Sequence, residues 1–167
     1  MTGTLWRAAQ LSDIDAMLEL TQQHYLVELN SVLTINLTKL AHRLAHSIID
    51  QNFNHTHQIQ TVWQNNKLIA WSWLSRGAST DYIDEEVAEA HMLHIDLNLR
   101  PRHRIQLVNQ ILDQWIAWCK ILKIPVLAST TVRSEWQTFM ELHRRRGFVV
   151  HGSHAFYDIR KETNYVQ

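Results

Sequence analysis

The sequence is poor in cysteine, glycine, proline and net charge. One cysteine in 167 residues excludes a disulfide within the chain. Lys and Arg total 16, as do Asp and Glu, which argues against a general nucleic-acid binder because that role depends on a basic field. No apolar run approaches the roughly 18 residues of a membrane span, and the N-terminus has no charged-then-apolar signal. We therefore expect a cytoplasmic protein without a membrane partner.

The remaining composition is typical of a globular chain. Apolar residues make up 46% and charged residues 19%. Four glycines and two prolines are spread without a linker, repeat or low-complexity segment. The length is sufficient for one well-filled core. We predict a single domain over residues 1–167.

Histidine is abundant, with eleven residues, and three pairs have spacings that metal ligands use. These pairs are His42 with His46, His55 with His57, and His91 with His94. No Glu accompanies the first pair and there is no cysteine cluster, so we expect no metal site. Cys119 falls on the apolar side of a predicted helix, where it is expected to be a buried, small hydrophobic residue.

The first half of the chain alternates strand and helix signals. Residues 4–9 predict a strand, and Ser12 with Asp15 three positions later predicts the start of a helix. Asn36 is the expected N-cap of a second helix over residues 37–50. Residues 57–64 and 67–76 alternate around Asn65-Asn66, which predicts a hairpin because Asn tolerates positive φ. We expect residues 77–84 to form a polar loop.

The stretch from Ala88 to Leu107 carries most of the functional information. Its first half predicts a strand, and Arg100, Arg102, His103 and Arg104 then crowd into a short turn. Apolar residues three and four apart predict a helix behind that turn, from Ile105 onward. A strand, a basic turn and a helix N-terminus in this order favour an anion site, because free amides and the helix dipole face the turn.

The C-terminal part predicts three more elements. Residues 125–131 are a predicted strand, and residues 134–146 a helix that Gly147 ends as its C-cap. Residues 148–150 and 155–159 predict a closing hairpin. The order of strands and helices along the chain places the protein in the α/β (α+β) class.

Two segments resemble the GNAT superfamily of N-acyltransferases. Leu93-His94-Ile95-Asp96 resembles the family's central strand end, and Arg100 stands at the first position of its Arg/Gln-x-x-Gly-x-Gly/Ala turn. His103 and Ile105 replace the small residues of that turn. About 40 residues later, Leu142-His143-Arg144-Arg145-Arg146-Gly147-Phe148 resembles the family's Leu-Tyr-Glu-Lys-x-Gly-Phe, with His143 in place of Tyr.

The resemblance implies a fold and a donor. The fold is a single-domain, mixed and largely antiparallel twisted sheet of about six to seven strands, flanked by about four helices. The donor is acetyl-CoA or another acyl-CoA. By analogy with the family, the pantetheine arm of the donor is expected to bind the main chain of Leu93, His94 and Ile95. By the same analogy, the pyrophosphate is expected to bind at the turn made by Arg100, Arg102, His103, Arg104 and Ile105. Charge-assisted contacts from the three arginines, each worth about 1.5–3 kcal/mol, offset the lost glycines.

The resemblance also implies catalytic candidates. Glu89 matches the catalytic glutamate of histone-acetylating members, and His91 is the alternative base. His143 is the candidate acid for the leaving thiolate, because an imidazolium carries a proton near neutral pH. The expected acceptor is a small-molecule amine or a peptide, without nucleic acid, and the protein is expected to be a monomer or a homodimer. Two alternatives stay open: a catalytically inactive GNAT-fold binding or structural module, and a CoA-sensing regulatory domain.

Overall fold

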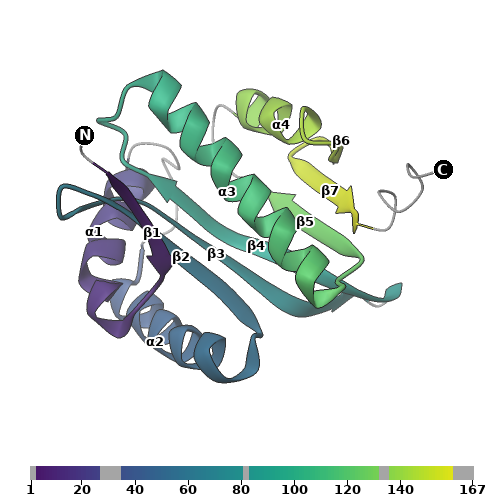
Figure 1. Ribbon diagram of the computed structural model, residues 1–167, viewed down its shortest axis with the longest axis horizontal. Helices are drawn as coiled ribbons and strands as arrows, with labels where there is room; N and C mark the ends of the chain where they lie inside the picture. The colour runs from purple at the N-terminus through teal and green to yellow at the C-terminus, as the bar shows by residue number, and fades with distance from the viewer. Residues whose placement is uncertain (1–2, 27–34, 81–82, 132–135, 160–167) are drawn as a thin grey trace. The chain divides into compact units, whose positions relative to one another are not determined.

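The computed structural model describes residues 3–26, 35–80, 83–131 and 136–159. Its strands are β1 (Thr4–Ala8), β2 (His57–Gln64), β3 (Lys67–Thr80), β4 (Ile83–Ile95), β5 (Val126–Thr130), β6 (Val149–His151) and β7 (His154–Asp158). Its helices are the short 3₁₀ helix η1 (Leu11–Asp13), α1 (Ile14–His24), α2 (Leu37–Asn54), α3 (Pro101–Leu122) and α4 (Trp136–Arg144). Figure 1 labels the seven strands and the four α-helices.

The strands form one seven-stranded sheet in the order β1-β2-β3-β4-β5-β7-β6. The pairs β1–β2, β5–β7 and β6–β7 are antiparallel, whereas β4 and β5 are parallel. The parallel register runs from Val87 with Val126 to Ala90 with Ser129, although β4 itself continues to Ile95. The predicted fold class, a mixed sheet with about four flanking helices, is confirmed.

The described chain groups into two compact units. The first comprises Met1–Trp73 and Met92–Leu107, and the second comprises Leu74–His91 and Val108–Gln167. The strands β3 and β4 and the helix α3 each belong partly to one unit and partly to the other. A single domain over residues 1–167 stays a prediction.

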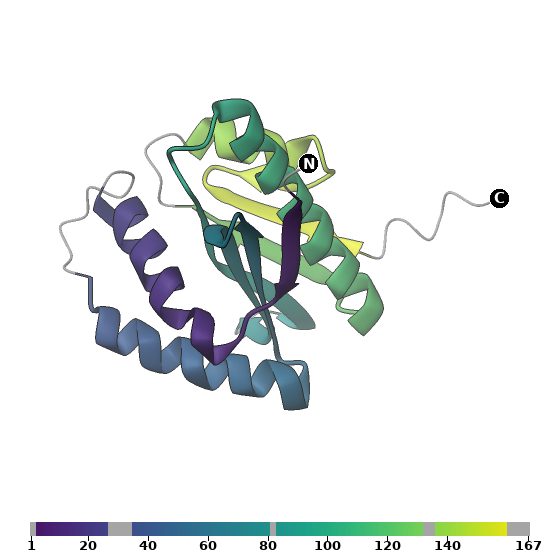
Figure 2. The ribbon, with the colours of Figure 1, turned by 60° about the vertical axis from the view of Figure 1, so that its left-hand side comes forward.

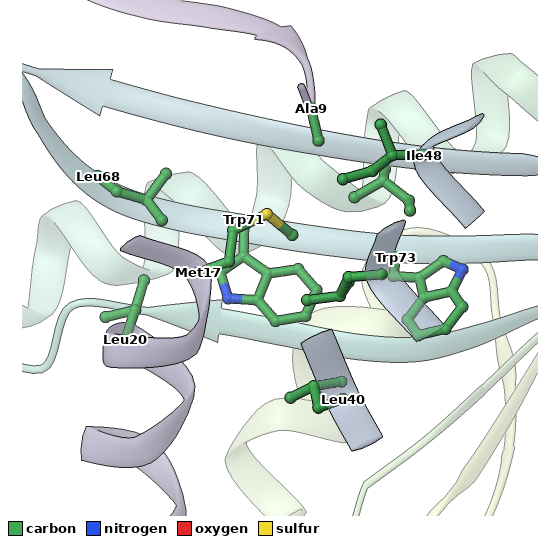
Figure 3. Close-up of a cluster of buried hydrophobic side chains, with 10 residues drawn as sticks. Ala9, Met17, Leu20, Leu40, Ile48, Leu68, Trp71 and Trp73 are labelled. Atoms are coloured by element: carbon green, nitrogen blue, oxygen red, sulfur yellow. The ribbon is translucent and has the colours of Figure 1, made fainter. Parts of the chain in front are cut away.

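The first unit is built on one apolar core between two helices and the sheet. The helices α1 and α2 lie on the same face of β1, β2 and β3 (Figure 2). Trp71 and Trp73 point to this face from β3 because residues two apart share a face of a strand. Met17 and Leu20 of α1 and Leu40 of α2 pack around them (Figure 3).

Local signals place the ends of the elements in this unit. The Asn36 side chain accepts a hydrogen bond from the Lys39 amide at 2.8 Å, which confirms it as the N-cap of α2. Asn65 and Asn66 have φ of 52° and 59°, as expected for the hairpin. The cap predicted at Ser12 is wrong. Instead, Asp13 accepts the Gln10 amide at 2.8 Å and binds Arg7 at 2.6 Å, so η1 precedes α1.

The loop predicted at residues 77–84 is the main correction in the second unit. β3 runs on to Thr80, β4 begins at Ile83, and residues 81–82 lie outside the described part. Arg76 binds both carboxylate oxygens of Glu86, at 2.6 and 2.8 Å, and joins the two strands. The hydrogen bond from Arg76 holds the pKa of Glu86 below its ordinary value. The polar residues of this segment therefore belong to two paired strands, although their composition is typical of a loop.

The core of the second unit follows the predicted helix face. Ile111, Leu112, Trp115 and Cys119 of α3 are all buried. Burial raises the pKa of the Cys119 thiol to about 12, so this cysteine is a core residue, as expected. Gly147 ends α4 with φ of 85°, which confirms the predicted C-cap, while residues 134–135 of the predicted helix lie outside the described part.

Candidate functional site

The end of β4 in the first unit presents a polar backbone edge. The amide of Asp96 donates to the Ile69 carbonyl of β3 at 2.8 Å. Because successive residues of a strand direct their hydrogen-bonding groups to opposite edges, Ile95 faces away from β3. There, the Nε2 atom of His24 lies against the Ile95 carbonyl and 3.2 Å from the Ile95 nitrogen. Leu93 shares this edge by alternation, and His94 does not.

Asp96 organises the turn that follows. Its carboxylate accepts the Asn98 amide at 2.9 Å and the Asn98 side chain at 3.0 Å, and it binds Lys67 at 2.5 Å. Asp96 is buried, and burial alone would raise its pKa. The hydrogen bonds and charge of Lys67, with the Asn98 amide, outweigh this and hold the pKa below its ordinary value. The turn is therefore fixed by a charged group at its base.

We predict that Asp96→Asn lowers the free energy of unfolding by about 1.5–3 kcal/mol at pH 7, since a hydrogen-bonded charge is lost. The depressed pKa means that this stability is present above the unfolded pKa, about 3.9, and is lost as pH falls through the lower folded value. Urea unfolding at pH 7, 5 and 3 should show the difference between wild type and variant shrinking below about pH 4. A difference that is independent of pH would contradict this assignment. Asp113→Asn, at an exposed pair with Arg146, is the matched control and should have an effect of about 1 kcal/mol or less.

The basic segment begins the helix and does not precede it. α3 starts at Pro101, four residues before the predicted start at Ile105. Proline suits the first helical position because its ring fixes φ and no amide is needed there. The amides of His103 and Arg104 both donate to the Arg100 carbonyl, at 2.9 and 3.1 Å. The helix start thus offers an anion at most the main-chain amides of Arg100 and Arg102.

Side-chain charge remains available at this helix start. Arg100 and Arg102 are exposed, and His103 and Arg104 are half-buried. The Nε atom of Arg104 is buried and makes no hydrogen bond within the described residues. Ile105 is 43% exposed and stands where a glycine or alanine was expected from the resemblance. An anion here would be held mainly by guanidinium groups.

The second unit holds the candidate bases. Glu89 and His91 are both exposed on β4. Glu89 pairs in register with Ala128 of β5, one residue before the parallel register ends. The His91 Nε2 atom lies 2.6 Å from the Ser75 hydroxyl of β3. Glu89 therefore has a side chain that solvent reaches, as a base for an incoming amine requires.

The second unit also holds His143, which is fully buried on α4. Its Nδ1 atom lies 2.9 Å from the Phe139 carbonyl, which can only accept, so Nδ1 carries the proton. Its Nε2 atom is then an acceptor, 3.0 Å from the Ser129 hydroxyl. Burial lowers the pKa of His143 to about 4. The expectation of an imidazolium near neutral pH is therefore corrected: His143 is neutral, because its ring is sealed among Phe139, Phe148 and Ser129.

Sequence reasoning missed three polar residues of these two regions. His24 was detectable, because it continues the buried positions Met17, Leu20 and Thr21 of α1 at helical spacing. Ser129 lies two residues after Leu127, on the same face of the predicted strand, and was detectable as a buried hydroxyl. The contact between Lys67 and Asp96 joins residues 29 positions apart and had no sequence signal.

Two comparisons with known proteins found no match: no family model matches the chain, and neither does any curated protein. Solved structures do match. An N-acetyltransferase from Staphylococcus aureus Mu50 superposes with a TM-score of 0.71 at 15% identity, over 95% of this chain and 99% of that one. A GNAT superfamily phosphinothricin acetyltransferase from Sinorhizobium meliloti, in complex with acetyl-CoA, gives 0.71 at 14% identity, over 93% and 86%. The chain has the GNAT fold.

A third solved structure has a similar fold at low sequence identity. The PaiA N-acetyltransferase from Thermoplasma acidophilum, in complex with coenzyme A, superposes with a TM-score of 0.69 at 12% identity, over 92% of this chain and 96% of that one.

Within the described residues, no helix is long and apolar enough to cross a membrane. The same residues contain no group of three His, Cys, Asp or Glu side chains that could hold a metal ion.

Proposed function

We propose that this chain is an acyl-CoA-dependent N-acyltransferase that transfers an acetyl group to a primary amine. The observation that carries the proposal is the end of β4 with the start of α3: a polar strand edge, a turn fixed by Asp96, and three arginines. Two of the GNAT-fold structures above hold acetyl-CoA or coenzyme A, which supports a donor of this class.

Each part of the donor has a suitable partner in the first unit. The edge of Leu93 and Ile95 can hydrogen-bond the amides of a pantetheine arm. Arg100, Arg102 and Arg104 can bind the pyrophosphate, and the unpaired Arg104 Nε is a donor that an anion would satisfy. His103 and Ile105 flank this position on the first turn of α3 without adding amides to it.

The chemistry is assigned to residues of the second unit. Glu89, or His91 as the alternative, accepts a proton from the ammonium group so that the free amine can attack the thioester carbonyl. The resemblance makes His143 the acid for the departing thiolate. Its ring is fully buried, however, and with a pKa of about 4 only about one molecule in a thousand carries imidazolium at pH 7. The thiolate therefore takes its proton from solvent or from the protonated base.

Two alternatives rest on the same helix start. Pro101 has no amide, and Ile105 replaces a small residue, which favours a GNAT-fold module without catalysis. A CoA-sensing domain would keep the arginines and release its ligand unchanged. A small-molecule or peptide amine is the acceptor class in the leading proposal.

Calorimetric titration of the purified chain with acetyl-CoA and with CoA tests the proposal. We expect saturable binding of both ligands, and amine-dependent CoA release in a screen of polyamines, aminoglycosides, amino acids and peptide N-termini. Absence of heat and of any thermal shift at millimolar ligand would support the module. Binding without turnover for any amine would support the sensor.

A further inference from the structure

We propose that His24 competes with the acyl donor for the main chain of Ile95 and thereby sets the donor affinity of this chain. The inference rests on the proposed function, because it is the acyl-CoA arm that would need this edge. It is drawn entirely within the first unit, from the contact between α1 and the end of β4.

The contact covers both polar groups of Ile95. The Nε2 atom of His24 lies within hydrogen-bond distance of the Ile95 carbonyl and of the Ile95 nitrogen. One nitrogen cannot serve both groups at once, since it either carries a proton and donates or is bare and accepts. In either tautomer, the ring stands in front of this residue on the edge that faces away from β3. A pantetheine amide cannot bond Ile95 while the ring is there.

Packing holds the ring in that position. His24 is 2% exposed, and its ring meets the His94 ring edge-on with centroids 5.1 Å apart. The His94 ring lies in turn against Trp71, at 5.0 Å, on the wall of the apolar core. The contact of His24 with Ile95 is therefore held in place by the packing of buried rings.

The place of His24 in its helix makes displacement feasible. His24 is the last residue of α1, and the ends of helices rearrange more readily than their interiors. Donor binding therefore exchanges one hydrogen bond of Ile95 for another, and the donor affinity is reduced by the contact it must break. A typical net hydrogen bond corresponds to about a two- to tenfold change in affinity.

The test compares acetyl-CoA binding by wild type, His24→Ala and His24→Gln in calorimetry. His24→Ala clears the edge, and we expect it to bind acetyl-CoA about two- to tenfold more tightly than wild type. His24→Gln keeps a side-chain amide that can bond Ile95 and should stay near wild type. His42→Ala, which removes an exposed histidine of α2, is the matched control and should change nothing. Thermal unfolding of each variant verifies that it is folded.

A second measurement follows the histidine side chains of the wild-type chain itself. In nitrogen-15 spectra of labelled histidine side chains, adding CoA should shift the His24 ring signals and leave those of His42 unchanged. The signal missing from His24→Gln, or from His24→Ala, identifies His24.

The outcomes separate the two proposals. Unchanged or weaker binding by folded His24→Ala, or an unmoved His24 signal at saturation, overturns the competition while the proposed function stands. Binding by His24→Ala alone supports the competition in its strongest form. Absence of binding by wild type and by every variant overturns the proposed function, and the competition with it.

Discussion

Replacing Arg100, Arg102 and Arg104 together with Ala is expected to weaken acetyl-CoA binding by about 10³-fold or more. Pro101 supplies no amide and the amides of His103 and Arg104 are already donated, so charge must hold the pyrophosphate. Three charge-assisted contacts of about 1.5–3 kcal/mol each exceed the 4.1 kcal/mol that a thousandfold loss requires. Calorimetry at constant ionic strength measures the loss.

The control removes the same charge elsewhere. Arg144 and Arg145 lie at the end of α4 and Lys120 in the last turn of α3, all exposed, and replacing these three with Ala lowers the net charge equally. This control should leave the affinity within about twofold. Wild-type affinity should also fall between 0.05 and 0.5 M salt, because exposed charges are screened. An affinity that salt does not change, or an equal loss in the control, would contradict the compensation of lost amides by charge.

Glu89→Gln is expected to lower turnover by about 10²–10⁴-fold while leaving acetyl-CoA affinity unchanged. The amide is nearly isosteric, and the donor is assigned to other residues. The acid limb of the pH profile of kcat/KM should weaken or vanish, because the group whose deprotonation sets it is gone. The measurement needs the acceptor that the amine screen identifies.

Glu85→Gln is the matched control for this prediction. Glu85 is an exposed carboxylate on the same strand, four residues before Glu89, and is assigned no chemical role. A wild-type rate and an unchanged acid limb in Glu89→Gln would make Glu89 structural. The same measurements on His91→Gln would then decide whether His91, now hydrogen-bonded to Ser75, is the base.

The fold was largely predictable because its signals are local. Asn36, the Asn65-Asn66 pair and Gly147 each fix an element end through their own backbone preferences, and the structure uses all three. The loop at residues 77–84 was mispredicted because its residues pair as strands, and the contact of Arg76 with Glu86 joins residues ten positions apart. Composition shows polar residues but not the partner that binds them.

For the candidate site, the sequence indicates which residues to consider, but it says less about their charge and their contacts. The sequence places Glu89 correctly on β4, but it puts the arginines in a turn before the helix, whereas α3 already begins at Pro101. It could not show that His143 is neutral, because the charge depends on burial by Phe139 and Phe148, which flank it in space. It could not show His24 on Ile95 either, since 71 residues separate the two.

The division of the chain into two units has a consequence for the order of folding. The first unit needs Met92–Leu107 as well as Met1–Trp73, and the second needs Leu74–His91 with the last 60 residues, from Val108 to Gln167. A nascent chain that has emerged only as far as His91 lacks the strand end that receives His24, and it lacks Met92, which packs against the core of the first unit. Neither unit is formed by one continuous segment of the chain. Contacts between residues so far apart in the sequence slow folding, because the chain loses conformational entropy on closing the loop before the contacts form. Because β4 contributes residues to both units, the loss of this strand would disrupt both.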